Sequence, residues 1–215
     1  QEAAIEANLA EDFHGLIADI DDVVRRTVEI ARNATVVVEA LDRGGVEEAR
    51  AEQFETGLIS LAWAAPPPQT PSTLQELVSS GGLSRLTDPS LRAVLSRFLE
   101  QRETVKGMAN QLVQARFTNA QRRDLPIFLE PGSVADLEAA YQSGAYESIA
   151  AYSELQGVSS TLARYDFDAM RADPAIRDMY VTSRDLNNTY LSWLVSLRDS
   201  AQAVVDHLED AETTP

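Results

Sequence analysis

Residues 9–41 read LAEDFHGLIADIDDVVRRTVEIARNATVVVEAL, and this stretch decides the fold of the chain. Its apolar or small residues recur at alternating steps of four and three: Leu9, Phe13, Leu16, Ile20, Val23, Thr27, Ile30, Ala34, Val37 and Leu41. These steps keep one stripe on one side of an α-helix, so the pattern predicts a long helix that packs lengthwise on partner helices. Further apolar residues, including Ile17 and Val24, widen the stripe beyond a two-stranded seam and indicate a helical bundle.

Start and stop signals for helices recur along the rest of the chain. Glycine pairs and prolines are placed to end helices, and Asp88-Pro89 and Asp173-Pro174 are placed to start them. Ser72 and Gln75 have the spacing of a capping box. From these signals and the apolar periodicity we predict helices over residues 2–41, 46–64, 72–78, 89–119, 134–142, 146–165 and 175–208.

This pattern predicts an all-α fold, a helical bundle of about three long helices with several short helices. No alternating apolar–polar run is long enough to predict a strand. We expect one domain over residues 1–215, with sub-parts 1–119 and 133–210 joined by a proline-containing loop. Within that loop we expect Ile127, Phe128 and Leu129 to fold onto the bundle as a hydrophobic plug.

Charge and composition argue against several classes of function. The net charge is −16, from 34 acidic and 18 basic residues. Such a surface repels phosphate backbones and anionic lipid, so we predict no nucleic-acid binding and no direct adsorption to membranes. The chain has no cysteine, which removes disulfides, thiolate nucleophiles and cysteine-based metal sites. No run of about 18 apolar residues is present that would span a bilayer.

Motifs for metal binding and catalysis are incomplete in this sequence. Glu11 and His14 have the spacing of half a di-iron motif, but Val204 stands three residues before His207, where the second half would need a glutamate. We therefore interpret His14 as a surface or partly packed histidine. There is no Gly-x-Ser-x-Gly elbow and no glycine-rich phosphate loop after a strand. We predict no enzymatic activity, no cofactor and no metal, with a metal-dependent enzyme as a remote alternative.

Three residues are candidates for contact with a ligand or a partner: Arg92, Arg102 and Trp63. Arg102 falls within an apolar stripe, and a buried arginine must pair either with an internal carboxylate, the preferred interpretation, or with a ligand anion. Trp63 precedes a triple proline and is read as a core residue or an interface anchor, or as lining a groove. Asn187 and Asn188 interrupt the stripe of the last helix, where they either fix helix register or face water.

An ordered series of residues in the first half of the chain resembles the core signature of a bacterial family of unknown function. The series is Pro71-Ser72-Thr73-Leu74-Gln75-Glu76-Leu77, Ser80-Gly81, Leu83, Leu86, Asp88, Leu91-Arg92 and Leu95. Members of that family have one N-terminal transmembrane helix followed by a helical extracytoplasmic domain, and residues 9–20 are similar to the helix after the anchor. The resemblance covers residues 5–118 and implies topology rather than chemistry, because the family carries no established activity.

The resemblance implies the extracytoplasmic, periplasmic domain of a single-pass bacterial membrane protein. We expect such a domain to act without catalysis, in protein–protein interaction or sensing, with a protein or a second copy of the chain as partner. Because the sequence starts at Gln1 within a helical pattern, we also expect that an N-terminal piece has been removed. The alternative is a small-ligand-binding sensory bundle. A pocket lined by Arg92 or Arg102 would favour that alternative, and a solid core with an exposed apolar stripe would favour interaction.

Overall fold

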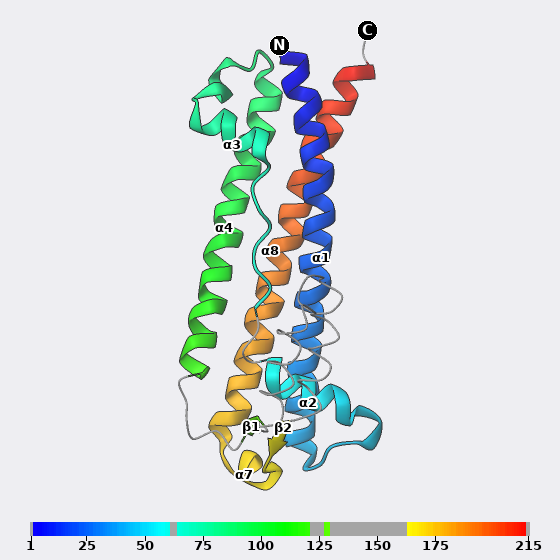
Figure 1. Ribbon diagram of the computed structural model, residues 1–215, viewed down its shortest axis with the longest axis vertical. Helices are drawn as coiled ribbons and strands as arrows, with labels where there is room; N and C mark the ends of the chain where they lie inside the picture. The colour runs from blue at the N-terminus through cyan, green and yellow to red at the C-terminus, as the bar shows by residue number, and fades with distance from the viewer. Residues whose placement is uncertain (1, 61–63, 121–126, 130–162, 214–215) are drawn as a thin grey trace, which may run out of the picture. The chain divides into compact units, whose positions relative to one another are not determined.

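The computed structural model describes residues 2–60, 64–120, 127–129 and 163–213, and it confirms the all-α helical bundle. Three long helices carry the fold: α1 (Glu2–Arg43), α4 (Pro89–Ala120) and α8 (Pro174–Thr213) (Figure 1). The short helices are α2 (Ala51–Ser60), α3 (Ser72–Ser79) and α7 (Phe167–Ala172), and the 3-10 turns are η1 (Glu48–Arg50) and η2 (Gly82–Arg85). Trp63 and the helix predicted over 134–142 lie outside the described residues.

A short pair of strands departs from the prediction. β1 (Ile127–Leu129) pairs with β2 (Ala163–Tyr165) in antiparallel fashion, with Phe128 opposite Arg164. The segment expected to form a plug is thus a strand. Residues 163–165 of the helix predicted over 146–165 form β2 instead, and the rest of that predicted helix lies outside the described residues. Strands of three residues are too short to show an alternating pattern, and their backbone hydrogen bonds come from a segment distant in sequence.

The helix starts and stops were mostly predicted from single residues. Asp88 Oδ1 accepts the Ser90 backbone N–H at 2.7 Å, and Asp173 Oδ1 accepts the Ala175 N–H at 2.9 Å, which confirms both Asp-Pro start signals. At the end of α1, Gly44 has φ +82°, a left-handed conformation that favours glycine, and its N–H binds the Ala40 carbonyl at 2.9 Å.

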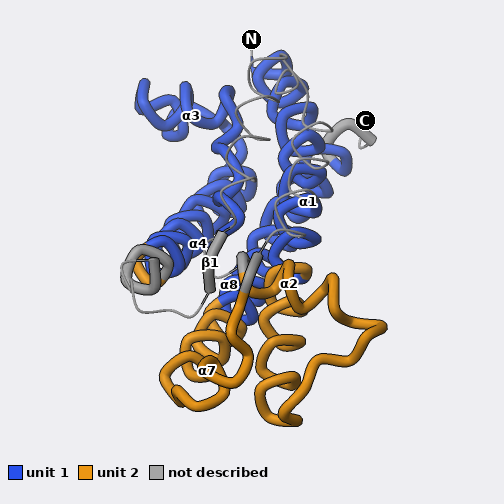
Figure 2. The backbone as a smooth tube through the Cα atoms, turned by 60° about the horizontal axis from the view of Figure 1, so that its bottom comes forward, with its two compact units in different colours: residues 1–28, 64–113, 187–215 blue, residues 29–63, 114–186 orange. Residues whose placement is uncertain are grey.

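The chain divides into two compact units (Figure 2). Unit 1 comprises residues 1–28, 64–113 and 187–215, and unit 2 comprises residues 29–63 and 114–186. Helices α1 and α8 each contribute residues to both units, so each unit combines segments that are far apart in the sequence. The sub-parts expected over 1–119 and 133–210 therefore do not coincide with the compact units.

The core of unit 1 is built from heptad stripes on the three long helices. On α1 the predicted stripe from Leu9 to Thr27 is at most 4 % exposed at every stripe position. The other two stripes also follow steps of four and three, with Arg102 at one position of the α4 stripe. Their buried members are Leu91, Leu95, Phe98, Val105, Ala109 and Leu112 on α4, and Asn187, Tyr190, Leu194, Leu197, Ala201, Val204 and Leu208 on α8.

Helices α1 and α4 run in the same direction within unit 1 (Figure 1). Near the start of both, the Glu2 carboxylate accepts the Thr87 N–H at 2.6 Å. Phe13 lies eleven residues after Glu2, and Phe98 lies eleven residues after Thr87. Their rings meet edge to face with centroids 4.9 Å apart. The shared spacing of these two contacts sets one parallel register for α1 and α4.

An extended segment, residues 64–71, also belongs to unit 1. Its buried residues are Ala65, Pro68 and Pro71, one in every three. That period matches a polyproline helix, which has three residues per turn and a fixed φ at each proline. The proline-rich sequence therefore forms the stiff connection that leads into α3, and its last residues lie beside α1 along a shallow hollow lined by Asp12 and Leu16.

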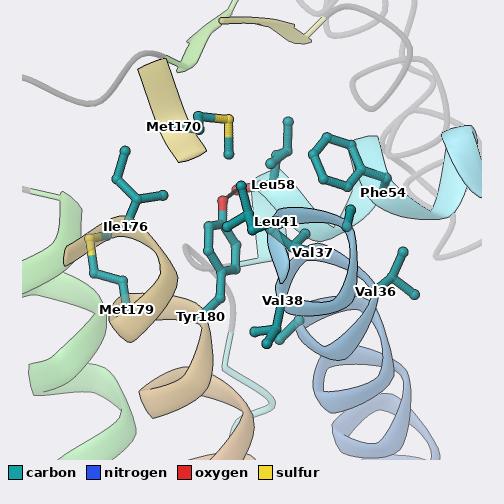
Figure 3. Close-up of a cluster of buried hydrophobic side chains, with 12 residues drawn as sticks. Val36, Val37, Val38, Leu41, Phe54, Leu58, Met170, Ile176, Met179 and Tyr180 are labelled. Carbon is teal, nitrogen blue, oxygen red and sulfur yellow. Dashed lines mark hydrogen bonds between the residues drawn. The ribbon is translucent and has the colours of Figure 1, made fainter. Parts of the chain in front are cut away.

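Unit 2 has its own apolar cluster, formed by the second part of α1 with α2, α7 and the first turns of α8 (Figure 3). Tyr180 is fully buried in this cluster, and its hydroxyl donates to the Leu58 carbonyl at 3.2 Å. Burial raises the pKa of Tyr180 far above its ordinary value, so the phenol stays protonated. The Phe54 ring of α2 packs at a tilt against the rings of Tyr165 and Phe167, which ties α2 to the end of β2 and the start of α7.

Candidate functional site

The two candidate arginines of α4 bind groups that are close to them in the sequence. The Arg92 guanidinium donates to the Leu86 carbonyl, which secures the turn before α4. Arg102 has a side chain 25 % exposed, and its guanidinium pairs with the Glu103 carboxylate at 3.0 Å. The partner of Arg102 is thus an acid of its own helix, in line with internal pairing. The structure does not bring Arg92 and Arg102 onto a common partner among the residues it describes.

His14 lies on the surface of unit 1, as the sequence interpretation proposed. Its Nε2 is 3.2 Å from Glu209 Oε1 on α8, and both side chains are more than half exposed. Glu11, the other member of the half-motif, is also exposed. Within the described ranges no group of three or more histidine or acidic side chains is arranged to hold a metal ion.

Asp12 caps a helix to which it does not belong. Its Oδ2 accepts the Thr73 N–H at 2.9 Å and the Ser72 hydroxyl at 3.2 Å, both in the first turn of α3. Burial opposes ionisation of this carboxyl, but the hydrogen bonds outweigh it and lower the pKa of Asp12 below its usual value. The capping box predicted for Ser72 and Gln75 is wrong, because Pro71 takes the cap position and a carboxylate of α1 supplies the acceptor.

Two ion pairs join α1 to α8, one in each unit. In unit 1, Arg198 makes two hydrogen bonds to the Asp21 carboxylate, at 2.6 and 3.3 Å. In unit 2, Arg177 binds Asp42 in the same two-pronged way, at 2.5 and 2.9 Å, and this hydrogen bonding lowers the pKa of Asp42. The pairs are 21 residues apart on both helices, which is three heptads, so the antiparallel register is the same in each unit.

The asparagine pair of α8 divides between core and surface. Asn187 is 1 % exposed and occupies a stripe position, whereas Asn188 is exposed. Thr27, the other buried polar residue of the stripes, satisfies its hydroxyl on the Val23 carbonyl at 2.7 Å. Buried polar side chains at stripe positions restrict the registers in which helices can pack, which is the role that the sequence allowed for Asn187.

The described residues of unit 1 line three hollows. The largest of these three, about 710 Å³, is bordered by the first turn of α1, by α3 and by η2, and its walls include Ile5, Leu77 and Arg85. The other two measure about 240 and 160 Å³. Arg92 and Arg102 line none of these three, so the arginine-lined pocket that would favour a sensory bundle is not among them.

Few large apolar side chains are exposed on the part of the chain that the structure describes. Trp193 and Val195 of α8 are 36 % and 45 % exposed, and Val78 at the end of α3 is 46 % exposed. The apolar periodicity of the last helix predicts Trp193 on its apolar face, but Trp193 is partly exposed, one residue before the buried Leu194. Tryptophan is enriched at protein interfaces, which makes Trp193 the exposed residue best suited to a protein contact.

Comparisons with known proteins found no match to the chain. No protein-family model matches it, and searches of curated proteins and of solved structures gave no match. No described helix is long and apolar enough to cross a membrane.

Proposed function

We propose that this chain is a non-enzymatic extracytoplasmic, periplasmic domain of a single-pass bacterial membrane protein, and that it acts by contact with another protein or in sensing. The proposed location rests on the sequence resemblance of residues 5–118 to a family with that topology. The proposed mode of action rests on the structure of unit 1, in which the stripes of three long helices are filled with side chains.

The filled interior of unit 1 is the observation that supports the proposed mode of action. Phe13, Leu95 and Phe98 are 0 % exposed, and the two rings pack edge to face between α1 and α4. Protein interiors packed in this way hold few voids larger than a water molecule. Recognition would then take place on the surface of the bundle.

The surface favours a protein partner of particular chemistry. A net charge of −16 attracts basic surfaces and raises the rate at which such partners are encountered. Trp193 offers an aromatic anchor on α8 of the kind that contributes strongly to protein interfaces. A partner with a basic rim around an apolar pocket would fit both features.

The alternative function is a small-ligand sensory bundle, and the largest hollow favours it. Its volume of about 710 Å³ lies within the range of sites for small molecules. Apolar walls at Ile5, Leu77 and Leu86 stand beside the charged groups of Glu76 and Arg85. This combination suits an amphipathic ligand rather than an anion held by Arg102.

A topology reporter tests the proposed location. The full product of the gene, fused at its C-terminal end to alkaline phosphatase, is expected to give phosphatase activity in living cells, because that enzyme matures only outside the cytoplasm. The matched fusion to a fluorescent protein that folds only in the cytoplasm should stay dark. An inactive phosphatase together with a fluorescent partner fusion would show that the domain is cytoplasmic and the proposal wrong.

A further inference from the structure

The only two histidines of the chain both pair with carboxylates across elements of unit 1, and both pairs involve the last turns of α8. His207 Nε2 of α8 lies 2.5 Å from Asp88 Oδ2, just before α4. His14 Nε2 of α1 lies 3.2 Å from Glu209 Oε1 of α8. We call these four residues the histidine latch.

The inner pair of the latch, His207 and Asp88, is the better shielded. Its side chains are 27 % and 36 % exposed, against 57 % and 60 % for His14 and Glu209. Exposed ion pairs contribute little to stability, so the inner pair should carry most of the effect. Asp88 also caps α4 through its other oxygen, which accepts the Ser90 N–H at 2.7 Å and fixes the carboxylate in place.

We propose that the histidine latch makes the docking of the last turns of α8 onto α1 and α4 depend on pH. Histidine is the side chain that changes charge between about pH 5 and 8. A protonated imidazole beside a carboxylate makes a charge-assisted hydrogen bond, which is stronger than the bond of a neutral ring. The latch therefore tightens when its imidazoles are protonated and loosens when they are neutral. This inference does not depend on the proposed function.

The charged groups around the latch act in the same direction. The groups placed beside the latch residues by a hydrogen bond or by a separation of at most four residues include Glu2, Glu11 and Asp12 on α1, Arg85 on η2, Arg92 on α4, and Asp206 and Asp210 on α8. Acids outnumber bases in this set, and Arg92 and Asp12 are already engaged in hydrogen bonds elsewhere. A positive charge on either histidine therefore reduces repulsion at this end of unit 1.

Asp88 sets the acid limit of the latch. The hydrogen bond with His207 is the main reason that the pKa of Asp88 lies below the ordinary value for aspartate. A carboxyl whose pKa is lowered on folding adds stability above its unfolded pKa, and that stability is lost as the pH falls through the lowered value. The latch therefore weakens in strongly acidic solution, once the Asp88 carboxylate is protonated.

Hydrogen exchange of the whole chain at about pH 5.5 and about pH 8 tests the latch. After correction for intrinsic exchange rates, the amides of residues 204–210 should be about two- to fivefold better protected at the lower pH, the range of exposed ion pairs. Amides in the core of unit 2 serve as an internal reference and should not show this difference. Equal protection of residues 204–210 at both pH values would overturn the proposal.

Three variants separate the latch from general effects of pH. Asp88→Asn keeps the cap of α4 but removes the charge, and His207→Gln keeps a polar side chain that does not titrate. Both should abolish most of the pH-dependent protection, whereas His14→Gln, the matched control at the outer pair, should retain most of it. A pH response unchanged in His207→Gln, or one lost equally in His14→Gln, would contradict the assignment of His207 as the main contact.

Discussion

Replacement of Phe98 by alanine is expected to destabilise the protein by about 3–5 kcal/mol, the usual cost of deleting a buried phenylalanine. Phe98 is 0 % exposed, and its ring packs edge to face on Phe13 with centroids 4.9 Å apart. Truncation removes this contact and leaves a cavity between α1 and α4, which rigid helices fill only in part. Urea unfolding followed by circular dichroism measures the change in the free energy of unfolding.

Phe98→Leu is the matched control for this prediction. Leucine keeps most of the buried apolar volume, so its cost should stay clearly below that of Phe98→Ala. A second comparison is Arg97→Ala on the same helix, where the side chain is exposed and the expected change is within about 0.5 kcal/mol. If Phe98→Ala cost no more than Arg97→Ala, the packing of α4 on α1 would be refuted.

Gly57→Ala is expected to destabilise unit 2 by about 1–3 kcal/mol or more, the range for overpacked sites. A Cβ at residue 57 would lie 2.6 Å from the Asn33 carbonyl oxygen and 2.7 Å from Val37 Cγ2. The oxygen belongs to the backbone of α1 and cannot turn away, so α2 would have to move off α1. This cost exceeds the roughly 1 kcal/mol by which alanine favours a helix over glycine.

Gly107 of α4 provides the opposite expectation for the same substitution. A Cβ there meets nothing within 4 Å, and the residue is exposed in the middle of a helix. Gly107→Ala should therefore stabilise the protein by about 0.5–1 kcal/mol through its effect on helix propensity. Thermal unfolding of the two variants should shift in opposite directions. Two stabilising shifts would show that α2 does not approach α1 as closely as the structure has it.

The sequence predicted the helices correctly wherever the apolar periodicity or the cap residues of a single helix were sufficient. The stripe from Leu9 to Leu41 is buried at every step, and the start signals at Asp88 and Asp173 act as caps. These features depend on residues a few positions apart, and helix periodicity or cap chemistry decides them locally.

Contacts between segments that are distant in the sequence could not be predicted from such local patterns. Asp12 caps α3 from 60 residues away, and His207 meets Asp88 across 119 residues. The residues around Asp12 and His207 in the sequence do not predict these partners, because each pairing depends on which helices become neighbours. The strand pair of Phe128 with Arg164 escaped prediction for the same reason.

The residues of the candidate site were likewise predictable only in part. Arg102 could be recognised as a polar residue within an apolar stripe, but the sequence did not say which acid would bind it, and the structure gives Glu103. The choice between Asn187 and Asn188 as the register residue also required the structure, because the buried face of α8 had to be known. The exposure of Trp193 follows from its place beside, rather than within, the α8 stripe.

Native mass spectrometry of the protein, released gently from its own host, distinguishes recognition on the surface from an internal ligand site. A bundle with a filled interior that recognises partners on its surface should retain no small molecule. The expected mass is that of the protein alone, of two copies or of a complex with another protein. A small molecule bound at one per chain would contradict surface recognition and would favour the sensory bundle, with a ligand in the hollow between α1, α3 and η2.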